Sequence, residues 1–379
     1  VGDEAGTAIT TGDSNTAVGF EALATEDTAS RNTAIGFRSL KTNNGGDNNT
    51  AVGENSGTAV TTGHNNTLIG QDADYNTALG SDALQSDTLG SKSTAVGAAA
   101  LSTQNFTSAT DSHNTAVGYE AGKAVTTGQY NTFVGSLTGD AMTTGENNVA
   151  MGQDALTTNV AGDNVVAIGN EAAQLLNPSG NVDMNGVYIG YQAGDEVTTG
   201  RHNTVIGALT ANALTTGSNN LLLGTTAGNA DQPGGSISTG GGQIVLGNAS
   251  STNAHIQIDW TVASDERDKT DFTALDLGLD FVKELEPVTY KWDKRAKYGN
   301  DISTITHDGT HKEDWLDVGF KAQAVEVLEK AAGYKIADKT NLTTSLTDDG
   351  KQYGLQYSKF VPILVKALQE LSEKNDALE

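Results

Sequence analysis

A short apolar run followed by glycine returns along the first two thirds of the chain. The string Asn-Thr-Ala-Val-Gly at residues 15–19 recurs with small changes, and fourteen units align on their last residue, here called the closing glycine. Nine of the thirteen spacings between closing glycines are 17 residues, and the others are 10, 21, 21 and 23. The closing glycines are Gly19, Gly36, Gly53, Gly70, Gly80, Gly97, Gly118, Gly135, Gly152, Gly169, Gly190, Gly207, Gly224 and Gly247. Such a period predicts stacked structural repeats that share one core.

Each column of the aligned repeat has a physical meaning. The residue before the closing glycine is apolar in all fourteen units, the one before that is Ala in eight and a larger apolar residue in the rest, and Thr precedes both in nine. This pattern predicts a short β-strand with apolar side chains on both faces. Asn stands at the strand entrance in ten units, where it suits a turn and a hydrogen-bonded ladder. Glycine at the exit suits a corner with positive φ.

A second signal lies about seven residues before several closing glycines. Thr-Thr-Gly occurs at residues 61–63, 126–128, 143–145, 198–200 and 215–217. It predicts the turn between two strands of one coil, so each unit is interpreted as one turn of a β-roll or β-helix with two strands and two turns. One coil is too small to bury its own apolar face. The two-faced strand therefore predicts that one face fills the coil and the other meets partner chains, most simply in a homotrimer.

Composition changes abruptly after Trp260. All three Trp lie at 260, 292 and 315, Lys becomes frequent, and the repeat stops. We therefore expect a mainly β chain in which residues 1–258 form a β-repeat shaft and residues 259–379 form a small α+β trimerisation domain.

The end of the chain has the pattern of an amphipathic helix. Its apolar spacings alternate between 4 and 3 residues, the seam of a heptad coiled coil, and Pro362 suits a first helical turn. The predicted trimerisation residues are Leu364, Leu368, Leu371, Asn375 and Leu378. The alternative reading is a lone surface helix packed on its own domain.

The charge is strongly acidic and unevenly distributed. Of the formal net charge of −25, residues 1–263 carry 6 basic and 24 acidic groups, or −18, and the remainder carries 16 and 23, or −7. Because phosphate binding needs clustered Lys and Arg, nucleic acid and anionic membrane surfaces are not expected partners. The chain has no Cys and no apolar stretch of about 18 residues, so neither Cys-based zinc sites nor membrane insertion is predicted. No cofactor or metal is expected; His307 and His311 share a loop and are interpreted as solvated.

Four blocks in the last third carry a family resemblance. Residues 263–271 read Ala-Ser-Asp-Glu-Arg-Asp-Lys-Thr-Asp, and residues 285–292 read Leu-Glu-Pro-Val-Thr-Tyr-Lys-Trp. Val-Gly-Phe-Lys-Ala-Gln follows at 318–323, and Tyr357 precedes the apolar seam. Together they resemble the endosialidase-type intramolecular chaperone domain of phage tailspikes and tail fibres. The repeat itself resembles the head repeats of trimeric autotransporter adhesins and similar repeats in phage fibres.

The resemblance implies that the chain cleaves itself between Ala263 and Ser264, with Ser264 as nucleophile and Lys269 as base. The hydroxyl of Ser264 can reach the preceding carbonyl through a five-membered ring, and water then opens the ester. Because Lys accepts a proton only when neutral, we expect Lys269 to be buried, which lowers a lysine pKa. Backbone amides are expected at the oxyanion. Asp268 stands where the family usually has an aliphatic residue, and its charge favours protonated Lys269.

The resemblance further implies a structural, host-facing fibre segment of a virion tail, with no external substrate. The insertions at 99–113, 172–186 and 229–242 are candidate contacts for a host-surface glycan or protein receptor. One alternative is a polysaccharide-degrading tailspike enzyme, but no carboxylate pair can be placed at glycosidase spacing. Another is a bacterial surface adhesin, against which the C-terminal domain argues because an autotransporter ends in a membrane anchor.

Overall fold

The computed structural model describes residues 1–25, 28–58, 64, 67–69, 76–229, 235–257, 260–298 and 305–378. The chain divides into two compact units. The first consists of Val1–Asn229 and Ile237–Gly247, and the second of Ala230–Ser236 and Asn248–Glu379. The predicted boundary between residues 258 and 259 lies outside the described residues, as do Gly70, Asn66 and the Thr-Thr-Gly at 61–63.

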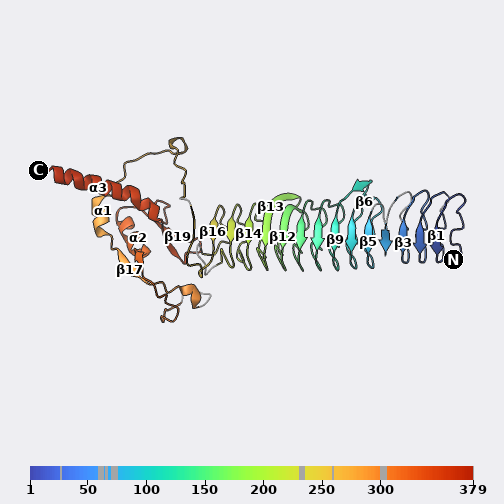
Figure 1. The fold of residues 1–379 in the computed structure, drawn as a ribbon. Helices are drawn as coiled ribbons and strands as arrows, with labels where there is room; N and C mark the ends of the chain where they lie inside the picture. Colours follow the sequence, from blue (N-terminus) through green and yellow to red (C-terminus); the bar gives the residue numbers. More distant parts are fainter. Residues whose placement is uncertain are drawn as a thin grey trace. The chain divides into compact units, whose positions relative to one another are not determined.

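The first unit is a β-solenoid, which confirms the mainly β fold predicted from the repeat (Figure 1). One parallel sheet contains fourteen strands in chain order, and each strand ends directly before a closing glycine. Partners in the ladder are one repeat apart, as in Thr16 opposite Thr33. The strands are β1 (Thr16–Val18), β2 (Thr33–Ile35), β3 (Thr50–Val52), β4 (Thr67–Ile69), β5 (Thr77–Leu79), β7 (Thr94–Val96), β9 (Thr115–Val117), β10 (Thr132–Val134), β11 (Val149–Met151), β12 (Gly162–Ile168), β13 (Val182–Ile189), β14 (Thr204–Ile206), β15 (Leu221–Leu223) and β16 (Ile244–Leu246).

The prediction of two strands in every coil is wrong for the described residues. Each described coil contributes one strand to the main sheet. The rest of most described coils is built from turns, and the exceptions are β6 (Gly90–Ser91) with β8 (Thr110–Asp111) and the lengthened first parts of β12 and β13. The reason is a run of left-handed residues two and four positions after the closing glycine, such as Glu21 and Leu23, both at φ 52°. Extended strand cannot continue through alternating left-handed residues. The turns still bond from coil to coil, since Leu23 N–H donates to Ser39 at 3.0 Å.

These left-handed positions are mostly not glycine. Of the 33 described non-glycine residues with positive φ, all but Asp271 and Lys339 lie in the solenoid. Such a conformation costs roughly 1–2 kcal/mol for each L-residue with a Cβ. The strain persists only where surrounding structure over-determines it. A single coil is therefore unfavourable, and the stack as a whole must stabilise it.

The predicted asparagine ladder is confirmed. Asn15 Oδ1 accepts the backbone N–H of Asn32 at 2.9 Å, and Asn32 Oδ1 accepts that of Asn49 at 2.8 Å. The Asn32 Nδ2 donates within its own coil to the carbonyl of Gly46 at 2.8 Å. Each buried amide thus both closes its own turn and bonds to the next coil, which satisfies backbone groups that the short strands leave free.

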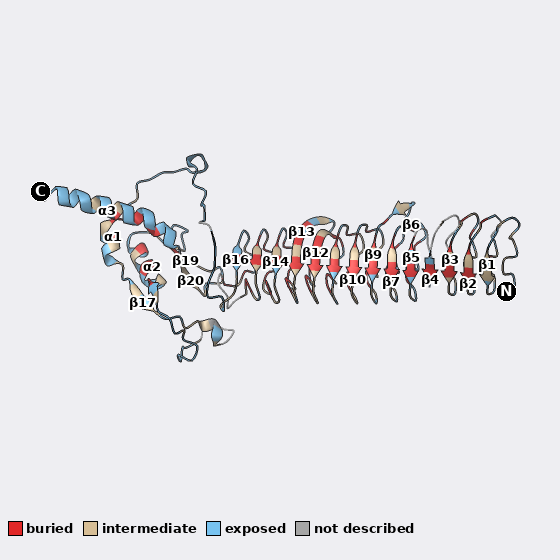
Figure 2. Cartoon of the chain, in the orientation of Figure 1, coloured by how far each residue is buried: buried red, intermediate tan, exposed pale blue. Residues whose placement is uncertain are grey.

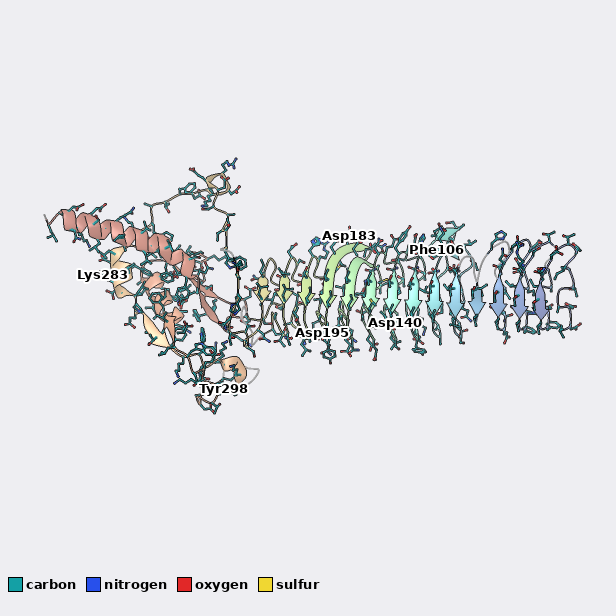
Figure 3. All side chains as sticks on the ribbon, viewed as in Figure 1. Phe106, Asp140, Asp183, Asp195, Lys283 and Tyr298 are labelled. Carbon is teal, nitrogen blue, oxygen red and sulfur yellow. The ribbon has the colours of Figure 1, made fainter. Side chains whose placement is uncertain are left out.

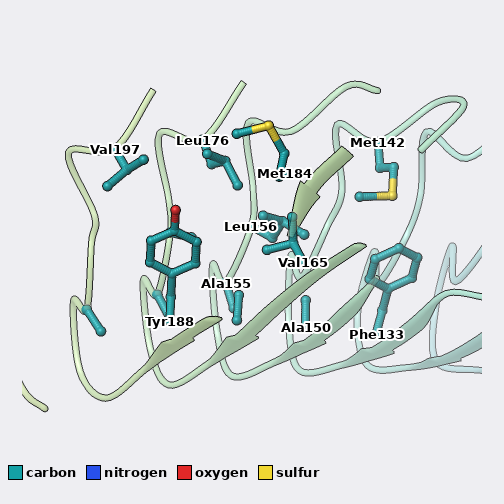
Figure 4. Close-up of a cluster of buried hydrophobic side chains, with 14 of the residues drawn as sticks. Phe133, Met142, Ala150, Ala155, Leu156, Val165, Leu176, Met184, Tyr188 and Val197 are labelled. Atoms are coloured by element: carbon teal, nitrogen blue, oxygen red, sulfur yellow. The ribbon is translucent and has the colours of Figure 1, made fainter. Parts of the chain in front are cut away.

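In the solenoid core, the side chains at two positions of the repeat vary in size in opposite directions, so that a large residue at one faces a small residue at the other. The middle strand residue points inward and packs against the residue four positions after the closing glycine (Figures 2 and 4). Coils with Ala as the middle strand residue commonly have Leu four positions after the closing glycine, as in Ala150 with Leu156. Where the middle strand residue is large, the other residue is small: a Cβ on Gly139 would lie 2.6 Å from Phe133 Cδ1, and one on Gly194 would lie 2.8 Å from Tyr188 Cε1.

This inverse relation in size predicts a compensating pair of mutations. Phe133→Ala alone is expected to cost about 3–5 kcal/mol of unfolding free energy, as a buried cavity does. Gly139→Leu alone is expected to destabilise by overpacking against Phe133. The double variant reproduces the Ala150 and Leu156 arrangement and is expected to recover most of the loss. Denaturant unfolding of all four proteins measures the coupling, and additive losses would contradict the inverse relation.

The predicted insertions are ordered where the structure describes them. The insertion at 99–113 includes β8 (Thr110–Asp111), which pairs in parallel with β6 (Gly90–Ser91) to form a small separate sheet. The insertion at 172–186 lengthens β13, whose first part pairs with the lengthened β12. Phe106 is buried at 5% exposure. Residues 230–234 of the third insertion lie outside the described residues.

The second unit has the expected α+β composition. Its core contains Leu277, Phe281, Val325, Phe360 and Ile363. Its helices are α1 (Leu279–Glu284), α2 (Ala322–Ala331) and α3 (Phe360–Asp376). Its antiparallel strand pairs are β17 (Val288–Tyr290) with β18 (Asp317–Gly319), and β19 (Thr344–Leu346) with β20 (Tyr353–Leu355). Single 3-10 turns occur at η1 (Glu266–Asp268), η2 (Arg295–Lys297) and η3 (Tyr357–Lys359).

Candidate functional site

The predicted serine and lysine meet. Lys269 Nζ lies 2.6 Å from Ser264 Oγ and 3.2 Å from the Ser264 carbonyl oxygen. The 3-10 turn η1 lies between them and brings the side chains to the same side over five residues. Its N-cap Asp265 accepts the backbone N–H of Arg267 at 2.9 Å. The local sequence therefore folds into a turn that supplies the contact required for proton transfer from serine to lysine.

An ion pair fixes the turn. Arg267 Nη2 lies 2.6 Å from Asp265 Oδ2, and the hydrogen bonds from Arg267 lower the pKa of the Asp265 carboxyl. Both groups are exposed, so the pair contributes little stability by itself. Its effect is on geometry, because it holds the middle residue of the turn and the N-cap together.

The expected burial of Lys269 is not found. Residues 260–274 are all exposed, and the apolar side chains of Trp260, Val262 and Phe272 are 74%, 77% and 67% exposed. Within the described residues the Ala263 carbonyl accepts no hydrogen bond, so the expected oxyanion donors are not in place either. The physical reason is that this segment packs on no other element of its own chain. The dyad geometry is present, while its desolvation and its oxyanion donors are not.

Asp268 does not pair with Lys269. In the described chain its side chain makes no ion pair with the lysine, whose ammonium is turned toward Ser264.

The predicted trimerisation residues lie on the outer face of α3. Leu364, Leu368 and Leu371 are 49%, 68% and 43% exposed, and Asn375 is also exposed. The adjacent face of the helix is buried through Phe360, Ile363 and Ala367. Pro362 lies in the first turn, as expected. The helix ends at Asp376, so Leu378 lies beyond it, and the prediction of a helical seam through Leu378 is wrong by two residues.

The face of α3 that packs on the domain is anchored by a carboxylate. Glu370 Oε2 accepts the first N–H of α1, from Leu279, at 2.7 Å. This bond is the leading cause that lowers the pKa of Glu370. Sequence reasoning missed it, because nothing in the spacing indicates that a helix-surface glutamate caps another helix. The same helix therefore holds its domain with one face and leaves the leucine face uncovered within the chain.

The histidines of the second unit pack on an aromatic ring. The ring centroid of Tyr298 lies 5.8 Å from that of His307 and 4.7 Å from that of His311 (Figure 3). His307 Nδ1 is 3.6 Å from Asp293 Oδ2. Across the described ranges no group of three or more His, Asp or Glu side chains is arranged to hold a metal. No helix in the part of the chain described is long and apolar enough to cross a membrane.

Two of the solenoid carboxylates with a raised pKa occupy the same position of the repeat. Asp140 and Asp195 both lie five residues after a closing glycine (Figure 3). Burial is the main cause that raises the pKa of each, and nearby Asp154 and Glu120 add to it at Asp140. Because burial is the largest cause of both pKa shifts, the shifts do not indicate the paired acid and base of a glycosidase site.

The comparisons agree with the C-terminal assignment. Residues 264–334 match the family model described as chaperone of endosialidase. Comparison with curated proteins gives no match for the chain. The matched region begins at Ser264, the residue in contact with Lys269. The chain thus combines a β-solenoid with a C-terminal region similar to the endosialidase chaperone, the organisation of a tail fibre or tailspike with a C-terminal chaperone domain.

Proposed function

We propose that this chain is a host-facing segment of a phage tail fibre, located in the virion tail, whose C-terminal domain brings three copies together and then cuts itself off between Ala263 and Ser264. The observation that carries the proposal is the 2.6 Å contact between Ser264 Oγ and Lys269 Nζ at the first residue of the family match. The proteolysis is directed at the chain itself.

The cleavage proceeds through an ester. Neutral Lys269 takes the proton of the Ser264 hydroxyl, and Oγ attacks the carbonyl carbon of Ala263. The C–N bond breaks, and the amine of Ser264 takes up the proton held by the lysine. Water then attacks the ester, which leaves a carboxylate on Ala263 and restores the hydroxyl of Ser264. No oxidant, metal or cofactor enters the balance.

Trimerisation supports the reaction because the single chain lacks part of the site. Lys269 and its neighbours are exposed, and the flanking Trp260, Val262 and Phe272 present apolar surface to solvent. Covering this segment with other copies desolvates the amine, which is what a lysine base requires. In this proposal cleavage therefore waits for assembly, and an unassembled chain keeps its chaperone domain.

The solenoid surface also supports a trimer. The residue directly before each closing glycine points outward, so apolar side chains form a ladder along one face. The described members that are more than a third exposed are Val18, Ile35, Ile69, Leu79, Val117, Met151, Ile206 and Leu246. A continuous exposed apolar stripe marks an interaction surface in a soluble protein. Three chains that bury this stripe about a common axis account for the two-faced strand of the repeat.

The α3 seam provides a direct test of assembly. The double variant Leu364→Ser and Leu368→Ser removes two exposed apolar side chains from the helix without touching its buried face. Because heptad leucines drive helix association, we expect light scattering to give a trimer mass for the wild type and a smaller mass for the variant. The control Gln369→Ser with Glu373→Ser changes two exposed positions of the same helix away from the seam. A trimer in both double variants would contradict assembly through α3.

A further inference from the structure

The bond proposed to break does not lie at the edge of the C-terminal unit. That unit contains Ala230–Ser236 and everything from Asn248 to Glu379. Residues on the solenoid side of the cut are therefore part of the same compact body as residues on the other side. Cleavage of a bond inside a compact unit breaks the chain without removing the contacts that hold the two pieces together.

One of these contacts lies in a cavity of about 670 Å³ within the second unit. Residues of the segment 248–252 form one of its walls, and Trp292, Lys294 and Glu313 form another. Lys294 Nζ donates to the carbonyl oxygen of Ala249 at 2.9 Å and lies 3.5 Å from that of Ser251. The Lys294 ammonium group thus donates to two backbone carbonyls, those of Ala249 and Ser251, shortly after the last closing glycine.

The lysine is itself held in place. Its side chain is 21% exposed, and its Nζ lies 3.6 Å from the carboxylate of Glu313, which is 9% exposed. The ammonium also lies over the ring of Trp292, 5.9 Å from the centroid. The Glu313 backbone N–H donates to the Trp292 carbonyl at 2.8 Å, which ties the two supporting residues together. A charge-assisted hydrogen bond from a fixed, partly buried donor is stronger than one from a free surface lysine.

A second tether joins the same two sides. The backbone N–H of Ser236 donates to Asp349 Oδ2 at 3.2 Å. Asp349 is fixed in turn by hydrogen bonds from Thr347 Oγ1 and the Lys351 backbone N–H. Ser236 precedes the cut and Asp349 follows it.

We infer that the cavity around Lys294 is a peptide-binding site for the chain's own residues 248–252, and that it retains the C-terminal piece after cleavage. The inference rests on the proposed self-cleavage for its biological setting, although the site is present in the uncut chain. Cleavage and release are then separate steps. The chaperone domain dissociates only when the contacts between Lys294 and residues 248–252 break.

The test separates the two steps. A full-length chain with an affinity tag after Glu379 is cut in one of two ways: by itself, or by a site-specific protease whose recognition sequence replaces the exposed residues 253–257. The second route leaves residues 248–252 on the solenoid piece whether or not the chain cuts itself. Intact mass reports the cut, and the fraction of solenoid piece recovered through the tag reports retention.

The expected result is retention of the cut wild type and loss of retention in Lys294→Met. Removing a charged hydrogen-bond donor should raise the dissociation rate of the pieces roughly 10–100-fold. Lys297→Met is the matched control, since Lys297 pairs with the same Glu313 at 3.7 Å but, in the described chain, contacts no residue of 248–252. Immediate release of the cut wild type would overturn the inference, and so would equal retention by both variants. Failure of self-cleavage appears separately, as a wild-type mass that remains whole.

Discussion

Ser264→Ala is expected to remain a single chain of 379 residues, whereas the wild type yields pieces of residues 1–263 and 264–379. The substitution removes the hydroxyl proposed to attack the Ala263 carbonyl, so we expect the loss to be complete rather than partial. Lys269→Ala should give the same result, because it leaves Ser264 Oγ without the base that lies 2.6 Å away. Intact mass spectrometry of freshly expressed protein measures all three.

Two further variants sharpen this prediction. Thr270→Ala removes the other hydroxyl beside Lys269 and should cleave like the wild type. Asp268→Leu removes the negative charge next to Lys269. Because loss of this charge favours the neutral lysine, the variant should cleave faster. A wild type that remains whole, with an Asp268→Leu chain that cuts, would make the acid an inhibitor of the reaction. If both remain whole, the dyad is inactive and the domain is a permanent trimerisation cap.

Gly190→Ala is expected to give a large loss of solenoid stability from a single methyl group. Gly190 has φ +135°, and an added Cβ would lie 2.6 Å from both the carbonyl carbon and oxygen of Gly207 in the next coil. These are backbone atoms of the sheet ladder, so no side chain can move aside. Clash and unfavourable φ together predict a loss of about 3 kcal/mol or more.

Gly180→Ala is the matched control for that experiment. It lies in the same coil and also has positive φ, at +87°, but nothing lies within 4 Å of the added Cβ. It therefore carries the conformational cost without the clash. Thermal unfolding of the two variants should show a much larger decrease in Tm for Gly190→Ala. Equal decreases would mean that φ, rather than the close approach of coils, fixes glycine at the corner.

The repeat made most of the solenoid predictable. Asn and closing-glycine columns located all fourteen strands, because those residues have few other uses in a short strand between turns. The left-handed leucines, such as Leu23, could not be predicted. Leucine disfavours positive φ in isolation, and only stacking between coils makes that conformation the best available. The second strand expected in each coil fails for the same reason.

The candidate site was predicted less fully. Family resemblance gave Ser264 and Lys269, and the structure brings them together. Their exposure could not be predicted, because burial depends on what covers residues 260–274. The role of Lys294 could not be predicted from the sequence. Its hydrogen bond to the Ala249 carbonyl joins residues 45 apart, and a single lysine near a tryptophan in sequence does not indicate any one contact. Long-range contacts of this kind follow from the packed domain and not from local pattern.

The inverse relation between the sizes of the two core positions limits how this solenoid can evolve in length. Gly122 leaves room for two neighbours, since its added Cβ would lie 2.7 Å from Phe133 Cδ2 and 3.0 Å from Leu101 Cδ2. A recombinant that places Leu at this position would press the new side chain against both Phe133 and Leu101. Recombination between repeats is therefore not neutral at every junction. Related sequences that gain or lose coils should keep each large core residue together with the glycine that faces it, as Gly139 faces Phe133. We therefore expect the solenoid to change length by matched pairs of coils.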